Sequence, residues 1–288
     1  MEDLDKLING AIDMHLHAAP DTLPMRVDVV EAAQRAKDVG MKAIVIKNHF
    51  YPTAPLVTIV KKFITDIEIV GSICLDYEIG GLNSHALETS AQLGAKVVWM
   101  PTLSSANSRR KMSEGLDIDL KGEGYSILNG NGELVPEINE ILEIIREYNM
   151  VLASGHLSPD EIFALFSEAK KCGIEKLVVT HASSAEVSDR VPSLEEQKRL
   201  AQMGAFIEYT GNEIMPCDFG HDPAEMVELI KGVGAQHCIL SSDMGMAWGL
   251  YPEEGMRLFV STLLRYGITA SEIEQMIKRN PSELLDLE

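Results

Sequence analysis

The sequence predicts a single (β/α)8 barrel, and three observations support that fold class. Eight short apolar runs rich in β-branched residues recur along the 288 residues, and near-continuous apolar runs are typical of parallel strands buried on both faces. Amphipathic stretches that often end in glycine separate these runs. Successive runs mostly end about 30 residues apart, the length of one βα unit, and eight such units in about 250 residues complete a barrel.

The eight predicted strands are defined by their β-branched and small apolar residues. In chain order they are Gly10–His17, Ala43–His49, Ile67–Asp76, Ala95–Pro101, Met150–His156, Lys176–His181, Ala205–Thr210 and His237–Asp243. An open doubly wound sheet is the competing architecture. It usually has fewer strands, and no phosphate-binding glycine fingerprint follows the first strand here, so the barrel is favoured.

Helices are predicted between the strands from capping residues and apolar spacing. They cover Val27–Val39, Ser158–Cys172, Ser193–Met203, Asp222–Val233 and the C-terminal stretch Thr269–Leu287. The helix over Ser158–Cys172 begins with a full capping signal, because Ser158 suits an N-cap, Pro159 suits the first turn and Glu161 completes a capping box. In the last stretch, the pair Asn280-Pro281 is expected to break the helix into two short ones.

The connection after the fourth strand is the exception, with roughly 55 residues between strand ends in place of the usual ~30. It contains Asn129-Gly130-Asn131-Gly132 between apolar residues, a pattern typical of a tight hairpin. We therefore predict a hairpin-bearing insertion over about residues 103–135. No linker or low-complexity segment divides the chain, so residues 1–288 are expected to form one domain.

The composition argues against several classes of partner. Asp and Glu total 44 against 25 Lys and Arg, a net charge of −19, whereas proteins that bind nucleic acid or anionic membranes carry basic patches. No basic-then-apolar leader opens the chain, no apolar run reaches the ~20 residues that span a bilayer, and the four cysteines form no CxxC pair. We expect a cytoplasmic protein with a small-molecule partner. Its assembly into a homo-oligomer stays open, because no heptad pattern or apolar patch is evident.

Polar side chains at the predicted strand ends carry the functional prediction, because active sites of (β/α)8 barrels lie at the C-terminal ends of the strands. Five of the eight histidines stand there with one aspartate: His15, His17, His49, His156, His181 and Asp243. His15 and His17 share one face of their strand and can hold one cation. Each histidine alone is compatible with an ordinary strand, but the whole set indicates a site for Zn²⁺, Fe²⁺ or Mn²⁺.

These residues resemble the amidohydrolase superfamily of metal-dependent hydrolases, from Asp13–His17 to the Asn-Pro ending in Arg279–Leu285. The resemblance implies that the metal ligands are His15, His17, His156, His181 and Asp243. Within the superfamily the chain is most similar to an uncharacterised amidohydrolase-like group. The segments that carry this similarity are Lys47–His49, Gly80–Asn83, Val98–Thr102 and Ser154–Ser158.

One departure from the superfamily's binuclear pattern leaves the number of metals open. Those enzymes bridge two metals with a carboxylated lysine or a glutamate that ends strand 4, whereas this strand reads Lys96-Val97-Val98-Trp99-Met100-Pro101. Either one ion is held or another group bridges two, the candidates being Lys47, Asp76, Glu78 and Glu208. Zn²⁺ is the expected metal, with Fe²⁺ and Mn²⁺ as alternatives. Lys47 and His49 share a face by their two-residue spacing, and both are expected to act in catalysis.

The resemblance implies hydrolysis by metal-activated water at an amide, lactone or related ester bond of a small molecule. A cation lowers the pKa of bound water from 15.7 to about 7. Asp243 would accept the water proton and deliver it to the leaving group. With a single metal on His15, His17 and Asp243, either His156 or His181 would stabilise the developing oxyanion.

Two other functions stay open. Phosphoesterases of the polymerase-and-histidinol-phosphatase type also begin with His-x-His, place a histidine where His49 lies and use a glutamate that Glu78 matches. They usually carry a histidine two residues after the strand 8 aspartate, where this chain has Gly245. A barrel that binds metal or ligand without turnover would have the same composition.

Substrate contacts are expected from the loops that follow the strands. The polar candidates are Arg26, Lys47, Tyr51, Arg109 and Arg110. Arginine suits bidentate recognition of carboxylate or phosphate, so Arg109-Arg110-Lys111 in an acidic chain suggests a small anionic substrate. A solvated loop cluster is the simpler interpretation of the same residues.

Overall fold

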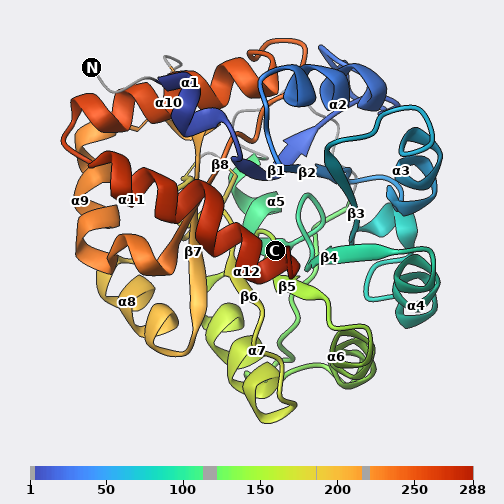
Figure 1. Ribbon diagram of the computed structural model, residues 1–288. Coiled ribbons are helices and arrows are strands. Elements are labelled where there is room, and N and C mark those ends of the chain that lie inside the picture. Colours follow the sequence, from blue (N-terminus) through green and yellow to red (C-terminus); the bar gives the residue numbers. More distant parts are fainter. Residues whose placement is uncertain (1–3, 113–121, 186, 216–220, 288) are drawn as a thin grey trace.

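The computed structural model describes residues 4–112, 122–185, 187–215 and 221–287. Within these residues eight parallel strands follow one another around a ring in the order β1 to β8 (Figure 1). The strands are β1 (Ile12–His17), β2 (Ala43–Lys47), β3 (Glu68–Cys74), β4 (Ala95–Trp99), β5 (Val151–Ala153), β6 (Leu177–Val179), β7 (Ala205–Thr210) and β8 (Cys238–Ser241). The predicted (β/α)8 barrel is confirmed.

The ring closes between the first and last strands through the residues that follow β8. The backbone N–H of Asp243 donates to the carbonyl oxygen of His15 at 2.8 Å, and the N–H of His17 donates to that of Met244 at 2.8 Å. The N–H of Ser242 donates to Oδ1 of Asp13 at 2.9 Å. The segment that follows β8 is therefore hydrogen-bonded to β1 at the end of the barrel where the predicted site residues lie.

Most helices cover the outside of the strands, whereas α5 and α12 appear at the centre of the ring (Figure 1). The helices are α1 (Leu4–Ile8), α2 (Val29–Asp38), α3 (Ala54–Val60), α4 (Ser84–Gln92), α5 (Ala106–Met112), α6 (Glu137–Glu147), α7 (Pro159–Lys171), α8 (Leu194–Gln202), α9 (Pro223–Val233), α10 (Pro252–Arg265), α11 (Ala270–Glu274) and α12 (Asn280–Leu285), with short turns η1 (Tyr77–Ile79), η2 (Gly211–Ile214), η3 (Ala235–His237) and η4 (Gln275–Arg279). The four internal helices predicted from capping signals correspond to α2, α7, α8 and α9, and α7 has the predicted capping box of Ser158 and Glu161. Over the described residues, no helix has the length and apolarity that a membrane span requires.

The C-terminal stretch differs from its prediction, because Asn280-Pro281 does not break it. α11 passes through the π-helical turn η4 directly into α12. A wider π turn just before proline accommodates its missing N–H. The buried Asn280 side chain also donates to the carbonyl oxygens of Ala235 and Cys238, at 2.9 and 2.6 Å, which holds the turn against the start of β8.

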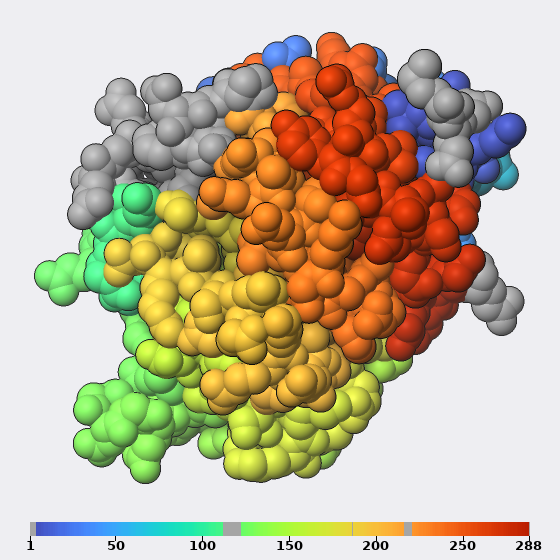
Figure 2. Space-filling view, turned by 90° about the vertical axis from the view of Figure 1, so that its left-hand side faces the viewer, coloured from blue at the N-terminus to red at the C-terminus, as the bar shows by residue number. Residues whose placement is uncertain are grey.

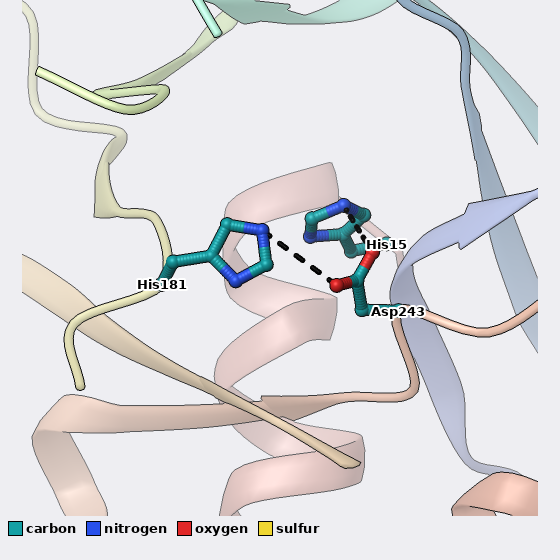
Figure 3. A group of neighbouring side chains, drawn as sticks. All are labelled: His15, His181 and Asp243. Atoms are coloured by element: carbon teal, nitrogen blue, oxygen red, sulfur yellow. Dashed lines mark ion pairs between the residues drawn. The ribbon is translucent and has the colours of Figure 1, made fainter. Parts of the chain in front are cut away.

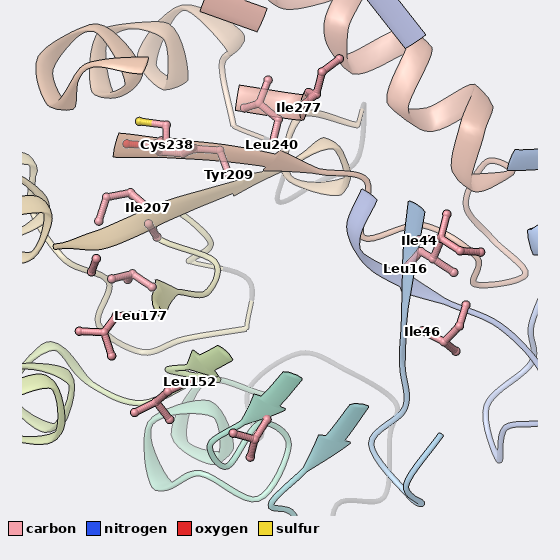
Figure 4. Packing of buried hydrophobic residues seen from close by; sticks show 14 of the residues in the cluster. Leu16, Ile44, Ile46, Leu152, Leu177, Ile207, Tyr209, Cys238, Leu240 and Ile277 are labelled. Atoms are coloured by element: carbon pink, nitrogen blue, oxygen red, sulfur yellow. The ribbon is translucent and has the colours of Figure 1, made fainter. Parts of the chain in front are cut away.

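The barrel has two apolar layers, one outside the strands and one inside them. The outer layer packs strands against helices and includes Leu16, Ile44 and Ile46 (Figure 4). The inner layer fills the barrel and includes Leu284 and Leu285 from α12. Figure 1 shows α12 across the centre of the ring, and the side view in Figure 2 shows the red C-terminal helices at one end of the molecule. This end is closed, which leaves the opposite end for the site.

The connection between β4 and β5 holds α5 and then a tight turn. Leu128 and Leu134 form a single antiparallel bridge, and the N–H of Asn129 donates to the carbonyl oxygen of Glu133 at 2.8 Å. Part of the predicted insertion, residues 113–121, lies outside the described residues. The extent of the insertion therefore stays a prediction.

Candidate functional site

An irregularity in β1 points both of its histidines into the barrel mouth. Between Asp13 and Leu16, β1 advances one residue more than its partner β2, as in a β-bulge. Met14 lies in the inner apolar layer, whereas Leu16 lies in the outer one. The extra residue brings His15 and His17 to the inner side, above Met14. Bulges commonly re-aim side chains next to active sites.

Asp243 is the group on which the histidines converge. Its Oδ1 lies 3.0 Å from His15 Nε2 and 3.2 Å from His17 Nε2, and its Oδ2 lies 3.7 Å from His181 Nε2. Figure 3 shows His15 and His181 directed at this carboxylate. His181 and Asp243 both have left-handed backbone, with φ of 51° and 50°, at a cost of about 1–2 kcal/mol each. The chain accepts this strain just after β6 and β8, where it directs the two side chains inward.

The five predicted histidines form a closed ring of neighbours in the mouth, and none is more than 8% exposed. Ring centroids lie 5.4 Å apart for His15 and His17, 5.1 Å for His17 and His49, 6.3 Å for His49 and His156, 5.2 Å for His156 and His181, and 5.1 Å for His181 and His15. The structure therefore brings together the whole set that the strand ends indicated.

Two buried carboxylates stand behind the histidines. Glu208 Oε2 lies 3.3 Å from His15 Nδ1, and Glu208 Oε1 accepts a hydrogen bond from Ser241 Oγ at 2.7 Å. Glu213 Oε1 lies 3.5 Å from His181 Nδ1. Glu208 holds the His15 imidazole so that Nε2 faces the mouth, the arrangement that usually supports metal-bound histidine. Glu213 lies beside His181 Nδ1, but that nitrogen has no hydrogen-bond partner among the described residues. Glu208 was predicted as a bridging candidate; Glu213 was missed, although a carboxylate just after a strand end is a usable signal.

His49 is held by a hydrogen-bond chain through Thr102 to Asp76. The Thr102 hydroxyl donates to Asp76 Oδ2, and His49 Nδ1 lies 2.7 Å from Thr102 Oγ1. Asp76 Oδ1 accepts the backbone N–H groups of Thr102 and Ser104 at 2.9 and 2.8 Å. Because the Thr102 proton is directed to Asp76, Thr102 accepts from His49 Nδ1–H, and His49 Nε2 is left for the pocket.

Lys47 is a buried cation at the same depth. It is 1% exposed, and its Nζ lies 2.9 Å from His15 Nε2 and 5.5 Å from the centre of the Trp99 ring. Over the described part of the chain, no carboxylate lies within ion-pair distance of this ammonium group. A buried ammonium without a paired carboxylate is costly in a structural role, which favours a functional one.

The pKa values of Asp243 and His17 suit a divalent cation, whereas that of His15 favours a bound proton. Burial raises the pKa of Asp243, but His15 and His181 outweigh burial and hold it well below its usual range. Burial lowers the pKa of His17 to about 4. Burial also lowers that of His15, but Asp243 and Glu208 raise it to about 9 overall. Metals bind ionised carboxylates and neutral imidazoles, so Asp243 and His17 are already in their metal-binding form. His15, whose pKa its carboxylate neighbours raise, would release a proton when an ion binds.

The residues present therefore fit a metal ion. His15, His181 and Asp243 offer ligand atoms within 4.8 Å of one another. His156 Nδ1 lies 3.2 Å from Ser108 Oγ, while its Nε2 is buried without a hydrogen-bond partner in the described structure. Buried polar atoms of native proteins are rarely left without a partner, and a metal would supply one.

A second group with suitable ligand atoms, His49, Cys74 and Asp76, fits a metal less well. Burial raises the pKa of the Cys74 thiol, whereas metals bind the thiolate. Both Asp76 oxygens already accept hydrogen bonds. We therefore assign the candidate metal position to the group around Asp243.

The other predicted residues lie outside the pocket. Arg26 donates to the carbonyl oxygen of Ala247 at 2.9 Å, and Tyr51 donates to that of Pro20 at 2.8 Å. Arg110 donates to Asp189 at 3.0 Å. Arg109 donates to the carbonyl oxygen of Leu103 and lies 5.6 Å above the Tyr77 ring. Glu78 is exposed on η1. Glu78 was the proposed match to a glutamate of the phosphoesterase alternative, and its exposed position removes that one point of support.

A cavity of about 150 Å³ opens above the histidines. Its lining divides into a polar floor of His17, Lys47, His49, His156, His181, Asn212 and Asp243, and an apolar rim of Leu23, Met25, Leu103, Val187, Met246 and Trp248. The floor was predicted except for Asn212. The rim was missed, because isolated apolar residues in loops carry no periodic signal.

A family model described as a family of unknown function, DUF6282, matches residues 10–208. The matched segment contains all five site histidines and ends before Asp243. Among curated proteins, none matches this sequence.

Solved structures share the fold over nearly the whole chain. An amidohydrolase from Pseudomonas aeruginosa has a TM-score of 0.67 at 15% identity, with 98% of each chain covered. The metallopeptidase dipeptidase AC has a TM-score of 0.64 at 12% identity, covering 97% of this chain and 98% of that one. A 2,6-dihydroxybenzoate decarboxylase from Rhizobium has a TM-score of 0.59 at 10% identity, covering 97% and 99%. The expected resemblance to amidohydrolases is confirmed at the level of the fold.

Proposed function

This chain belongs to the DUF6282 family, whose function is unknown, and from the geometry of its barrel mouth we propose that it is a metal-dependent hydrolase of small molecules. The observation that carries the proposal is the convergence of His15, His17 and His181 on Asp243 within 3.0–3.7 Å. Imidazoles and a carboxylate at an open strand end form the usual ligand set of catalytic divalent metals. The amidohydrolase and the metallopeptidase that share the fold support the proposal.

The metal ligands in this proposal are His15, His17, His156, His181 and Asp243. Zn²⁺ is the preferred ion because the set combines imidazole with carboxylate, and Fe²⁺ and Mn²⁺ accept the same ligands. A single ion agrees best with the poor fit of the group around Cys74. When bound, the ion polarises the oxygen of the scissile bond and lowers the pKa of water, so that hydroxide is available near neutral pH.

Asp243 acts as the general base of the reaction. Its low pKa keeps the carboxylate ionised at neutral pH. Oδ2 lies farther from its histidine neighbour than Oδ1 does, 3.7 Å against 3.0 Å, so it is the oxygen better placed to take a proton from the attacking water. The same carboxyl group then delivers the proton to the leaving group of an amide, lactone or related ester.

Lys47 and His49 complete the polar floor. The buried Lys47 ammonium donates to the oxygen on which negative charge develops, and such donors act strongly where water is excluded. His49, held through Thr102, presents Nε2 to the substrate. Both side chains line the cavity, so they are within reach of a bound molecule.

Turnover assays with Asp243→Asn test the proposal. The metal-loaded protein is screened against amides, lactones, phosphomonoesters and aromatic carboxylates. We expect hydrolysis of an amide, lactone or ester, reduced about 10³-fold in Asp243→Asn at saturating metal, and unchanged in the control Asp189→Asn, which alters an exposed carboxylate paired with Arg110.

Other outcomes would contradict the proposal. Preferential cleavage of phosphomonoesters would instead identify a phosphoesterase. Loss of CO₂ from an aromatic carboxylate would identify a decarboxylase, as in the Rhizobium structure. Equal turnover by Asp243→Asn and wild type would remove Asp243 from the reaction.

A further inference from the structure

The cavity above the histidines is polar at its floor and apolar at its rim. Among the residues that the structure describes, its rim is made by Leu23, Met25, Leu103, Val187, Met246 and Trp248, none of them charged. The only cation that lines the cavity among the described residues is Lys47, at the floor. A ligand that fills this space therefore meets polar groups at one end and apolar groups at the other.

Trp248 dominates the rim. It is 66% exposed, whereas Trp99, the only other tryptophan of the chain, is 2% exposed below the histidines. A large aromatic side chain gains by burial about 25 cal/mol for each Å² removed from water. Exposure of such a ring beside a reactive floor is typical of a surface that becomes buried when a ligand binds.

The loop that carries Trp248 is fixed against the loop that follows β1. Met25 and Met246 form an antiparallel bridge, and the N–H of Ala247 donates to the carbonyl oxygen of Pro24 at 2.9 Å. Gly245 makes the approach possible, because a Cβ there would lie 1.7 Å from the carbonyl oxygen of His17. The exposed ring thus stands on a backbone that is held in place before any ligand arrives.

We propose that the substrate carries a flat, uncharged apolar group of about one six-membered ring beside the bond that reacts, and that this group packs against Trp248. The cavity volume, floor and rim together, is about 150 Å³. Because a wholly apolar cavity of that size holds benzene, the space limits the group to about one ring. This inference rests on the proposed function, since the polar floor defines where the reacting bond lies. Among the described residues the rim carries no charged side chain, which disfavours a second ionic group at the outer end of the substrate.

The test measures binding of three neutral amides to the metal-loaded protein by calorimetry: benzamide, cyclohexanecarboxamide and acetamide. Benzamide is expected to bind about tenfold more tightly than acetamide, and more tightly than the non-planar ring. Trp248→Ala is expected to lose this advantage and Trp248→Phe to keep most of it. Phe63→Ala is the matched control, because it removes a ring that is 74% exposed and does not line the cavity.

Fluorescence gives a second readout, because acrylamide reaches the exposed Trp248 and not the buried Trp99. Benzamide is expected to protect Trp248 from quenching. Equal binding of benzamide and acetamide, or unchanged benzamide binding by Trp248→Ala, would overturn the inference. Protection of Trp248 from quenching that increases with protein concentration in the absence of ligand would also overturn the inference, since a second copy of the chain would then cover the ring.

Binding needs no turnover, so the two proposals fail separately. Binding of benzamide through Trp248 in a protein that hydrolyses nothing would contradict the hydrolase and leave this inference standing. Hydrolysis of small acetyl compounds, with no tighter binding of compounds that carry an aromatic ring, would support the hydrolase and contradict the role of Trp248.

Discussion

Replacing Glu208 with glutamine tests how the mouth orients its metal-binding histidines. The carboxylate lies 3.3 Å from His15 Nδ1 and accepts a second hydrogen bond from Ser241. Glutamine keeps the shape but removes the negative charge. The amide can also present its NH₂ group to His15. The His15 ring is then no longer fixed with Nε2 toward Asp243.

The expected loss follows from the burial of this contact. Removing a partner of a metal-bound histidine typically weakens metal binding 10–100-fold. Both side chains are almost fully buried, with 0% and 2% exposed, so solvent does not screen the lost charge. We expect Glu208→Gln to weaken Zn²⁺ binding roughly 30-fold, or about 2 kcal/mol. Glu213→Gln is expected to lose roughly tenfold, because its contact with His181 is longer at 3.5 Å.

The assay is competition for Zn²⁺ with a chromophoric chelator at one pH and ionic strength. Glu161→Gln is the control, because Glu161 is also a buried carboxylate, 4% exposed, but contacts Ser126 and Ser158 away from the mouth. Wild-type Zn²⁺ affinity in Glu208→Gln would show that Glu208 does not orient His15 for metal binding. Equal losses in Glu208→Gln and Glu161→Gln would show only a general effect of changing a buried charge.

Three further predictions concern stability and turnover. Gly155→Ala is expected to destabilise the fold by about 3 kcal/mol, because φ is +59° and the new Cβ would lie 2.2 Å from a backbone oxygen. In the control Gly173→Ala the new Cβ meets nothing within 4 Å, so the expected loss is about 1 kcal/mol. Equal losses of the two variants in urea unfolding would contradict this prediction. Thr102→Val is expected to lower kcat about tenfold with little change in KM, because His49 loses the partner of its Nδ1; a wild-type kcat would remove the hydrogen-bond chain from the mechanism. Burial raises the pKa of Asp13 from 3.8 to about 6, so the unfolded chain releases this proton first, and stability falls by about 3 kcal/mol as pH rises from about 4 to 6. Asp13→Asn is expected to lack that fall, and parallel stability curves for the two proteins would show that Asp13 does not titrate as described.

The strand-end residues could be predicted because two simple rules act together. Parallel strands of a barrel place their C-terminal ends at one rim, and residues two apart share a face. These rules were enough to assemble His156, His181 and Asp243 with the first pair of histidines. They did not show which side of β1 faces inward, since the bulge between Asp13 and Leu16 exchanges the two sides. The extra residue depends on pairing with β2, which the local sequence does not encode.

Contacts between distant segments explain the remaining differences. Thr102 joins His49 to Asp76 across two loops, and no spacing in the sequence links these positions. The helix across Pro281 is continuous because a π turn and tertiary hydrogen bonds offset the local rule for proline. The arginine cluster was a reasonable candidate by composition, but its side chains are engaged outside the cavity.

The most direct test of the central claim is the metal content and X-ray absorption spectrum of the purified protein. We expect about one tightly bound divalent ion per chain, surrounded by nitrogen and oxygen at about 2.0–2.2 Å with scattering from several imidazoles. The ion is expected to be lost in His181→Ala. Absence of a tightly bound ion, or a sulfur ligand at about 2.3 Å, would contradict the metal position around Asp243.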